Sequence, residues 1–266
     1  MKVEVKSLDG KNVKSVELPE QFNESYEPDL VNRAVLAIFS HKRQPYGAME
    51  KAGQGYSAKL SRRRRDYKGA YGKGISRVSR KTMWRRGMQF GWVGAIVPGT
   101  VGGRRAHPPK AYKVWDLKIN DTEREKAIRS AMNGVVTNSK LLIVEDKFES
   151  LNKTKEVKKV LENLGFNTEA VKRKTPGRAK SRGRAIRFKK NPLVIVSKNC
   201  NVVKAVGNIP GYDSIDVKSM NASLLSLGYG MPRPCIFTES ALSVLAKEKL
   251  FLGVKKWKLI KYLNIH

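Results

Sequence analysis

The chain has 266 residues and a formal net charge of +31 at neutral pH, from 54 lysines and arginines against 23 aspartates and glutamates. Such self-repulsion argues against an enzyme for small neutral metabolites and favours a polyanionic partner, nucleic acid first and an anionic membrane surface second. The two cysteines have no Cys or His at metal-ligand spacing, which argues against a zinc site and against a secreted disulfide scaffold.

The first 41 residues predict a β-hairpin followed by a helix. Apolar and polar residues alternate over 3–8 and again over 13–18, and Asp9-Gly10 between them is typical of a tight turn. Pro28 then opens a helix whose apolar residues between 30 and 39 form one stripe.

Residues 42–113 form the most unusual segment. Together with His41 they hold 19 lysines and arginines against only Glu50 and Asp66, as well as 12 of the 22 glycines and eight aromatic residues. No helix or strand period extends over any long window, and such a segment cannot bury enough apolar surface to fold by itself. A flexible linker would be poor in aromatic residues. We therefore predict a long extended arm that becomes ordered on a polyanion, for which structured RNA is the best candidate.

The globular pattern resumes at Trp115. The expected elements are a helix from Asn120 to 135 with Asn120 and Glu123 as its cap, a strand at 141–144, a helix at 157–164, a strand at 193–196, a helix at 202–206, strands at 215–217 and 235–237, and a helix at 239–247. This alternation predicts an α/β fold with a mostly parallel sheet and helices on both faces. We expect one discontinuous globular domain, 1–41 with 114–247, an inserted arm, 42–113, and a basic C-terminal tail, 248–266.

Two further segments are basic. Residues 172–190 contain ten lysines and arginines and no acid, with a turn at Pro176-Gly177. The tail mixes apolar side chains with lysines, and docking onto RNA or a neighbouring protein is a more economical interpretation than an amphipathic membrane helix. The N-terminus does not resemble a signal peptide, and no apolar run approaches the roughly 20 residues of a membrane span, so a cytoplasmic protein is expected.

Within the arm, two motifs favour RNA over simpler interpretations. An isolated run such as Arg62–Arg65 is usually a solvated or localisation patch, but here it lies among glycines and aromatic residues. Trp84-Arg85-Arg86 suits base stacking better than a small aromatic knot, because its neighbours are too charged to be buried. Gly72-x-Gly74 follows no strand and opens no apolar helix, so it is weak support for a dinucleotide loop.

Nothing in the sequence indicates catalysis. No Gly-rich loop is followed by a Walker lysine with Ser or Thr, so nucleotide hydrolysis has no support. His41, His107 and His266 lie in basic or terminal settings, and His107 fits a phosphate or base contact better than a general base. We therefore expect no enzymatic activity, no cofactor and no metal.

These segments also resemble a known family. The matching residues are Lys42-Arg43-Gln44-Pro45-Tyr46-Gly47, Lys51-Ala52-Gly53 with Ser57-Ala58, Arg77 with Arg80, Gly102-Gly103-Arg104-Arg105-Ala106-His107-Pro108-Pro109, Asn120-Asp121, Arg129-Ser130-Ala131, Val203-Lys204-Ala205 through Ile209-Pro210-Gly211, and Phe237-Thr238-Glu239-Ser240-Ala241. They occur in family order over nearly the whole chain. The sequence thus resembles the family of the universal fourth protein of the large ribosomal subunit, in its archaeal and eukaryotic branch.

The resemblance implies an α/β body on the subunit surface and an arm that reaches through large-subunit rRNA. It also implies rRNA binding early in subunit assembly, neighbouring large-subunit ribosomal proteins as partners, and an arm tip that lines the nascent-peptide exit tunnel. Carried onto this sequence, the tip lies within 72–90, and its residues are Arg77, Arg80, Trp84, Arg85 and Arg86. We expect no membrane partner and no homo-oligomer.

The candidate rRNA-binding residues are the cations and one histidine of the two basic segments. They are Arg43, Lys51, Lys59, Arg62, Arg63, Arg64, Arg65, Lys73, Arg77, Arg80, Lys81, Arg85, Arg86, Arg104, Arg105, His107 and Lys110 in the arm, and Lys174, Arg178, Lys180, Arg182, Arg184 and Arg187 in the second run. Two alternatives remain open: a free-standing RNA- or DNA-binding regulator or chaperone, and an RNA-processing enzyme with a basic substrate arm.

Overall fold

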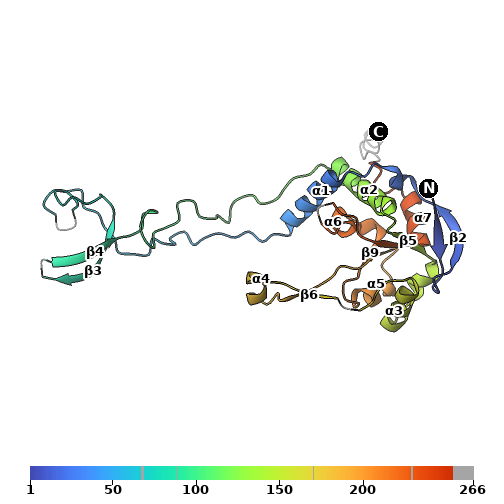
Figure 1. Ribbon diagram of the computed structural model, residues 1–266. Helices are drawn as coiled ribbons and strands as arrows, with labels where there is room; N and C mark the ends of the chain where they lie inside the picture. Colours follow the sequence, from blue (N-terminus) through green and yellow to red (C-terminus); the bar gives the residue numbers. More distant parts are fainter. Residues whose placement is uncertain (67–68, 88, 170, 229, 254–266) are drawn as a thin grey trace, which may run out of the picture. The chain divides into compact units, whose positions relative to one another are not determined.

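The computed structural model describes residues 1–66, 69–87, 89–169, 171–228 and 230–253 (Figure 1). Its contacts divide the chain into two units, residues 1–42 with 116–266 and residues 43–115. Of the basic tail predicted for 248–266, residues 254–266 lie outside the described residues.

A six-stranded sheet forms the centre of the first unit, in the order β2-β1-β5-β10-β8-β9. Its strands are β1 (Lys2–Lys6), β2 (Asn12–Glu17), β5 (Leu141–Val144), β8 (Leu193–Val196), β9 (Asp213–Asp216) and β10 (Cys235–Thr238). Only β1 and β2 pair antiparallel, as the predicted hairpin, and the other four pairs are parallel. The mostly parallel α/β sheet is therefore confirmed.

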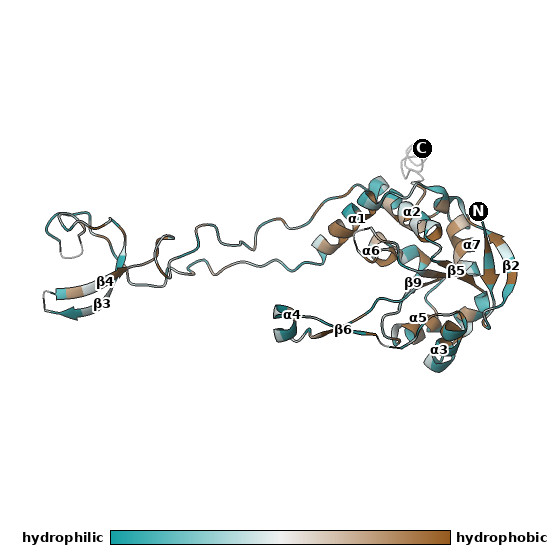
Figure 2. Ribbon diagram, viewed as in Figure 1, coloured by the Kyte–Doolittle hydropathy of each residue, from teal (hydrophilic) through white to brown (hydrophobic). Residues whose placement is uncertain are grey.

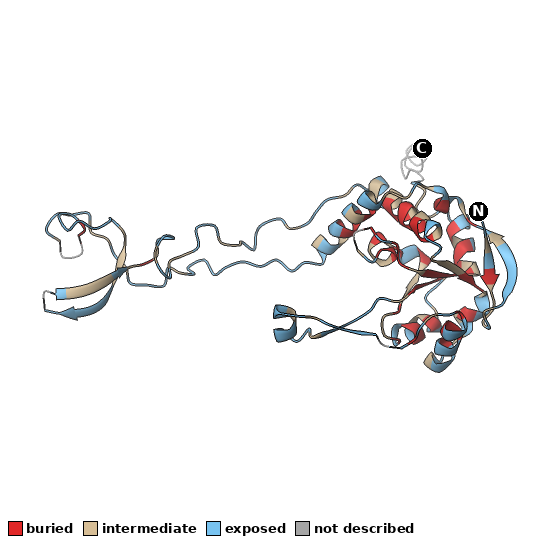
Figure 3. Cartoon of the chain, in the orientation of Figure 1, coloured by how far each residue is buried: buried red, intermediate tan, exposed pale blue. Residues whose placement is uncertain are grey.

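Helices cover both faces of this sheet. They are α1 (Pro28–His41), α2 (Asp121–Thr137), α3 (Thr154–Asn163), α5 (Asn201–Gly207), α6 (Ala222–Leu225) and α7 (Glu239–Lys247), with 3-10 turns η1 (Glu20–Asn23), η2 (Asp146–Ser150) and η3 (Val217–Ser219). Because side chains alternate along a strand, Ile195 and Phe237 pack with α1, α2, α6 and α7, whereas Val194 and Ile236 pack with α3 and α5. Figures 2 and 3 show the hydrophobic and buried residues gathered on the sheet and the helices beside it.

Two local predictions need correction, and one short helix was missed. Asn120 is the residue before α2, but its side chain makes no capping hydrogen bond. The strand expected at 215–217 runs from Asp213 to Asp216, and Val217 begins η3. Its polar first residues hid this strand, because Asp213 and Ser214 do not belong to an apolar run. The short helix α6 was not predicted.

The second basic run folds into a hairpin that the sequence pattern did not predict. β6 (Lys172–Lys174) and β7 (Ile186–Phe188) pair antiparallel, and α4 (Arg178–Ser181) lies in the connection. Thr175 closes the ladder by donating its N–H to the Ala185 carbonyl at 2.9 Å. Runs of three residues are too short to show a strand period among so many cations.

The second unit has almost no core. Of its described residues only Gly69, Ala70 and Ala95 are buried, and none has a side chain larger than a methyl group. Its regular structure is a hairpin of β3 (Arg80–Arg86) and β4 (Gln89–Gly94), which was not predicted. The pairing is irregular between Thr82 and Trp84, and this break conceals the alternation in the sequence.

The parts of the second unit before and after this hairpin approach each other closely. Ala48 donates its N–H to the Pro109 carbonyl at 3.0 Å. At Gly53, which has a φ of +74°, a Cβ atom would lie 2.7 Å from the Arg104 Cα. A glycine is required there both by the backbone conformation and by the neighbouring chain.

One carboxylate joins the carboxyl ends of β8 and β10. Glu149 accepts hydrogen bonds from the Ser197 N–H at 2.8 Å and from the hydroxyls of Ser197, Thr238 and Ser240 at 2.7, 2.5 and 2.8 Å. Burial by itself would raise the pKa of Glu149, but these hydrogen bonds outweigh it and hold the pKa below its ordinary value.

We expect this carboxylate to make the first unit sensitive to acid. Because the folded-state pKa of Glu149 is depressed, its contribution is complete above its unfolded pKa of about 4.3 and is lost as the pH falls through the lower folded pKa. Glu149→Gln should therefore lower the free energy of unfolding by about 1–3 kcal/mol at pH 7 and flatten its dependence below about pH 5. Urea unfolding followed by circular dichroism measures both. Glu156→Gln, on the exposed face of α3, is the control, and equal pH profiles for the two variants would contradict the prediction.

Candidate nucleic-acid interface

The predicted rRNA-binding residues fall into two groups, one in each unit. The larger group, from Arg43 to Lys110, lies entirely in the second unit. The smaller group, from Lys174 to Arg187, lies on the β6–β7 hairpin and its connection, where every predicted cation is exposed.

Four consecutive arginines of the second unit differ in their surroundings from cations of the first unit that form ion pairs. Arg62, Arg63, Arg64 and Arg65 are all exposed, and in the described part of the chain no ion pair joins them to an acid. In the first unit, by contrast, Arg129 pairs with Glu24 at 2.8 Å and Lys126 with Glu27 at 2.9 Å. The positive charge of residues 62–65 is therefore available to an external anion.

Aromatic rings alternate with these cations around the β3–β4 hairpin. The Arg80 guanidinium and the Lys73 ammonium lie 5.1 and 5.4 Å from the centre of the Trp92 ring. Lys81 lies 4.0 Å from the Tyr56 ring, and Arg77 lies 5.9 Å from the Tyr71 ring. These contacts hold the cations above ring faces. Basic and aromatic groups are thus presented together, as stacking and phosphate binding require.

The five residues predicted for the arm tip occupy both ends of this hairpin. Arg85 and Arg86 adjoin the turn at Gly87, and both are exposed. Arg80 instead faces Gly94 at the open end, and Arg77 precedes β3. Trp84 is 56% exposed although it crosses the opposite strand, where a Cβ at Gly91 would lie 2.2 Å from its Nε1. The indole is therefore not a buried aromatic knot.

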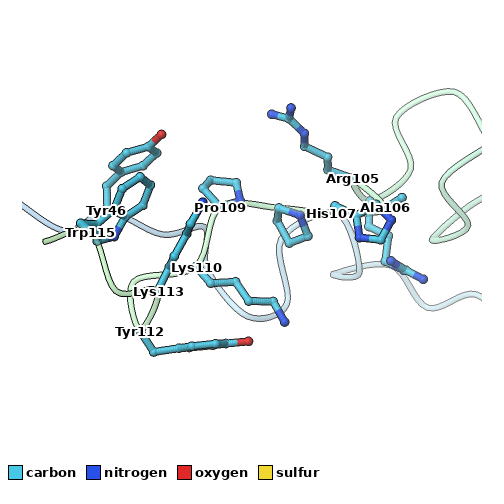
Figure 4. A pocket seen from close by; sticks show the side chains of 11 residues that line it. Tyr46, Arg105, Ala106, His107, Pro109, Lys110, Tyr112, Lys113 and Trp115 are labelled. Carbon is cyan, nitrogen blue, oxygen red and sulfur yellow. The ribbon is translucent and has the colours of Figure 1, made fainter. Parts of the chain in front are cut away.

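A hollow of about 810 Å³ lies within the second unit, between residues 104–115 and Tyr46 (Figure 4). Tyr46 stacks on Trp115 with ring centres 5.1 Å apart and an angle of 27°. The Arg43 guanidinium lies 4.2 Å from the centre of the Trp115 ring. Among the predicted residues, the hollow brings Arg104, Arg105, His107 and Lys110 together.

Several contributors were missing from the predicted set. Tyr46, Trp92, Tyr112, Lys113 and Trp115 all belong to the ring–cation contacts or to the hollow. Their signal was visible, because aromatic residues in a charged segment are unusual, but composition alone could not show which rings would face which cations.

The described residues offer little to catalysis. No three His, Cys, Asp or Glu side chains among them are placed to share a metal ion. Cys235 is fully buried, and burial raises the pKa of its thiol to about 12, so it stays protonated at neutral pH. His41 lies 3.7 Å from Asp116, an exposed pair that the sequence pattern did not reveal. In the same part of the chain, no helix has the length and apolarity that crossing a bilayer requires.

Comparisons with known proteins find relatives that match most of the chain. The sequence model of the ribosomal protein L4/L1 family matches residues 16–248. The large ribosomal subunit protein uL4 of Nanoarchaeum equitans is 43% identical, over 94% of this chain and 100% of the relative. Proteins of the same name from Archaeoglobus fulgidus and Methanocaldococcus jannaschii are each 37% identical, over 93% and 92% of this chain and 99% and 98% of their own lengths.

Proposed function

Because the chain belongs to the ribosomal protein L4/L1 family, we propose that it binds large-subunit rRNA through residues 43–115 and through the β6–β7 hairpin. As a member of this family it is a protein of the large ribosomal subunit, a structural constituent of the cytoplasmic ribosome and not an enzyme. Membership of this family argues against the alternative of an RNA-processing enzyme.

The observation that carries the proposal is a segment of high positive charge without a core. Only Gly69, Ala70 and Ala95 are buried among the described residues of the second unit, whereas Arg62–Arg65 are exposed and without acidic partners in that part of the chain. A segment of this kind gains its stability from the phosphates and bases around it. In this proposal residues 43–115 are an arm that enters folded rRNA.

Two further roles rest on the same segment. By neutralising phosphates of different rRNA helices, the arm would let these helices approach one another, which supports early subunit assembly together with neighbouring ribosomal proteins. The closed end of the β3–β4 hairpin, with exposed Arg85 and Arg86, would be the arm's tip and line the exit tunnel. These roles follow from the family resemblance, and the exposed cations at the turn support them.

We expect the protein to sediment with the rRNA, and we expect the rRNA to protect the arm from proteases. The protein should stay with large subunits after a high-salt wash, and a protease should cleave the free protein within residues 50–105 while this segment resists cleavage in the subunit. In the same subunits, nascent chains should crosslink to residues 84–87. Release into the wash, or resistance of residues 50–105 in the free protein, would contradict the arm proposal.

A further inference from the structure

The hollow between Tyr46 and residues 104–115 combines rings with cations and contains no acid. Its lining includes Arg104, Arg105, Lys110, Lys113 and three aromatic side chains. Its volume of about 810 Å³ lies within the range of roughly 300–1,000 Å³ typical of small-ligand sites. It can therefore accommodate a group of the size of a nucleotide.

Trp115 forms one wall of the hollow, and other side chains of the protein already cover its ring. Trp115 is covered by Tyr46 at 5.1 Å, by the Arg43 guanidinium at 4.2 Å and by the Lys113 ammonium at 5.1 Å. Arg43 also donates a hydrogen bond of 3.5 Å to the Tyr46 hydroxyl. Since its ring faces are already in contact, Trp115 is a fixed wall and not the surface on which a ligand stacks.

Tyr112 is placed differently. The residue is 77% exposed, and its ring lies apart from the Tyr46–Trp115 pair, with the Lys110 side chain beside it (Figure 4). The Lys110 ammonium lies 5.1 Å from the ring centre. The hollow thus presents an open aromatic face and a cation two residues apart in the chain.

We propose that Tyr112 is the stacking platform for one unpaired base of the rRNA, turned out of its helix, whose phosphate is held by Lys110. A nucleotide joins a flat ring to a phosphate, which matches this pairing of groups. The inference rests on the proposed rRNA binding and adds the site and the group that it takes. A peptide is the less favoured occupant. The hollow has no carboxylate to pair with a basic side chain. An acidic side chain could pair with the cations, but it has no ring to stack on Tyr112.

The test measures binding of the full-length protein to deproteinised large-subunit rRNA over a salt series. Stacking of a base is worth about 1–3 kcal/mol, a factor of five or more in affinity. Tyr112→Leu should therefore weaken binding at least five-fold without changing the salt slope, whereas Tyr112→Phe, which keeps the ring, should bind as the wild type does. Val114→Ala is the matched control, because Val114 is 83% exposed in the same segment and does not line the hollow.

Ultraviolet crosslinking of assembled large subunits identifies the occupant, which should be a nucleotide attached at Tyr112. If the wild type binds rRNA with strong salt dependence but the Leu and Phe variants bind equally, the base site is overturned while the proposed function stands. A crosslink from Tyr112 to a protein would also overturn it, in favour of a peptide. If the wild type shows no salt-dependent binding at all, the proposed function fails and the base site fails with it.

Discussion

A variant in which Arg62, Arg63, Arg64 and Arg65 are all replaced by glutamine should bind large-subunit rRNA at least ten-fold more weakly than the wild type at about 0.2 M salt. These side chains are exposed, and the described part of the chain offers them no acidic partner, so their charge is available to an external anion. Each phosphate contact contributes roughly 0.7 to 0.9 to the slope of log K against log salt. The slope should therefore become shallower by about three, which filter binding over a salt series measures.

The control removes the same charge from the first unit. Lys153, Lys155, Lys158 and Lys159 on and beside α3 are all exposed, and their replacement by glutamine changes the net charge by the same amount. If rRNA affinity depended on total charge alone, both variants would lose it equally. An equal change in slope would therefore contradict a localised interface, whereas an unchanged slope in the α3 variant supports it.

Arg233→Met should lower the free energy of unfolding of the first unit by about 1.5–3 kcal/mol, because it removes the hydrogen bonds of a buried charged group. The Arg233 side chain is only 2% exposed, pairs with Asp213 at 2.5 Å and donates to the carbonyls of Asn191 at 2.7 Å and Gly211 at 3.1 Å. Methionine fills similar space but leaves both carbonyls without this donor. The unfolding should be followed by circular dichroism. Tryptophan fluorescence would be less suitable, because Trp84, Trp92 and Trp115 lie in the second unit.

Lys190→Ala is the comparison for this prediction. Lys190 binds the same Asp213 oxygen at 2.7 Å, but its side chain is 57% exposed, so its loss should cost less than about 1 kcal/mol. Burial alone would raise the pKa of Asp213, whereas the hydrogen bonds from Lys190 and Arg233 lower it. A similar loss of unfolding free energy in both variants would contradict the prediction, because burial of Arg233 would then add nothing to the stability.

The sequence predicted the elements whose residues carry their own pattern. β8 and β10 are short apolar runs, and α1 has one apolar stripe, so period and length were sufficient. β9 was misplaced because Asp213, its first residue, is stabilised by Arg233, which lies far along the chain. Local pattern cannot report a partner of this kind.

The candidate interface was predicted as a composition and not as an arrangement. Which segments are basic was evident, but the β6–β7 and β3–β4 hairpins were not. Charged residues have no alternation to show, and Trp84 crosses Gly91 beside a pairing irregularity. Glu149 was missed because its hydrogen-bond donors, on Ser197, Thr238 and Ser240, lie far from it in the sequence. Both depend on contacts between distant residues.

The strand order delays completion of the sheet during synthesis of the protein. β10 lies between β5 and β8, yet of the sheet's six strands it is translated last. Until residue 238 has been added, β1 with β5 and β8 with β9 have nothing to join them, while residues 43–115 have long been translated. Such non-local pairing is slow. The pace of translation between residues 144 and 238 therefore sets how long an unfinished sheet coexists with an exposed polycation in a cytoplasm that contains competing RNA.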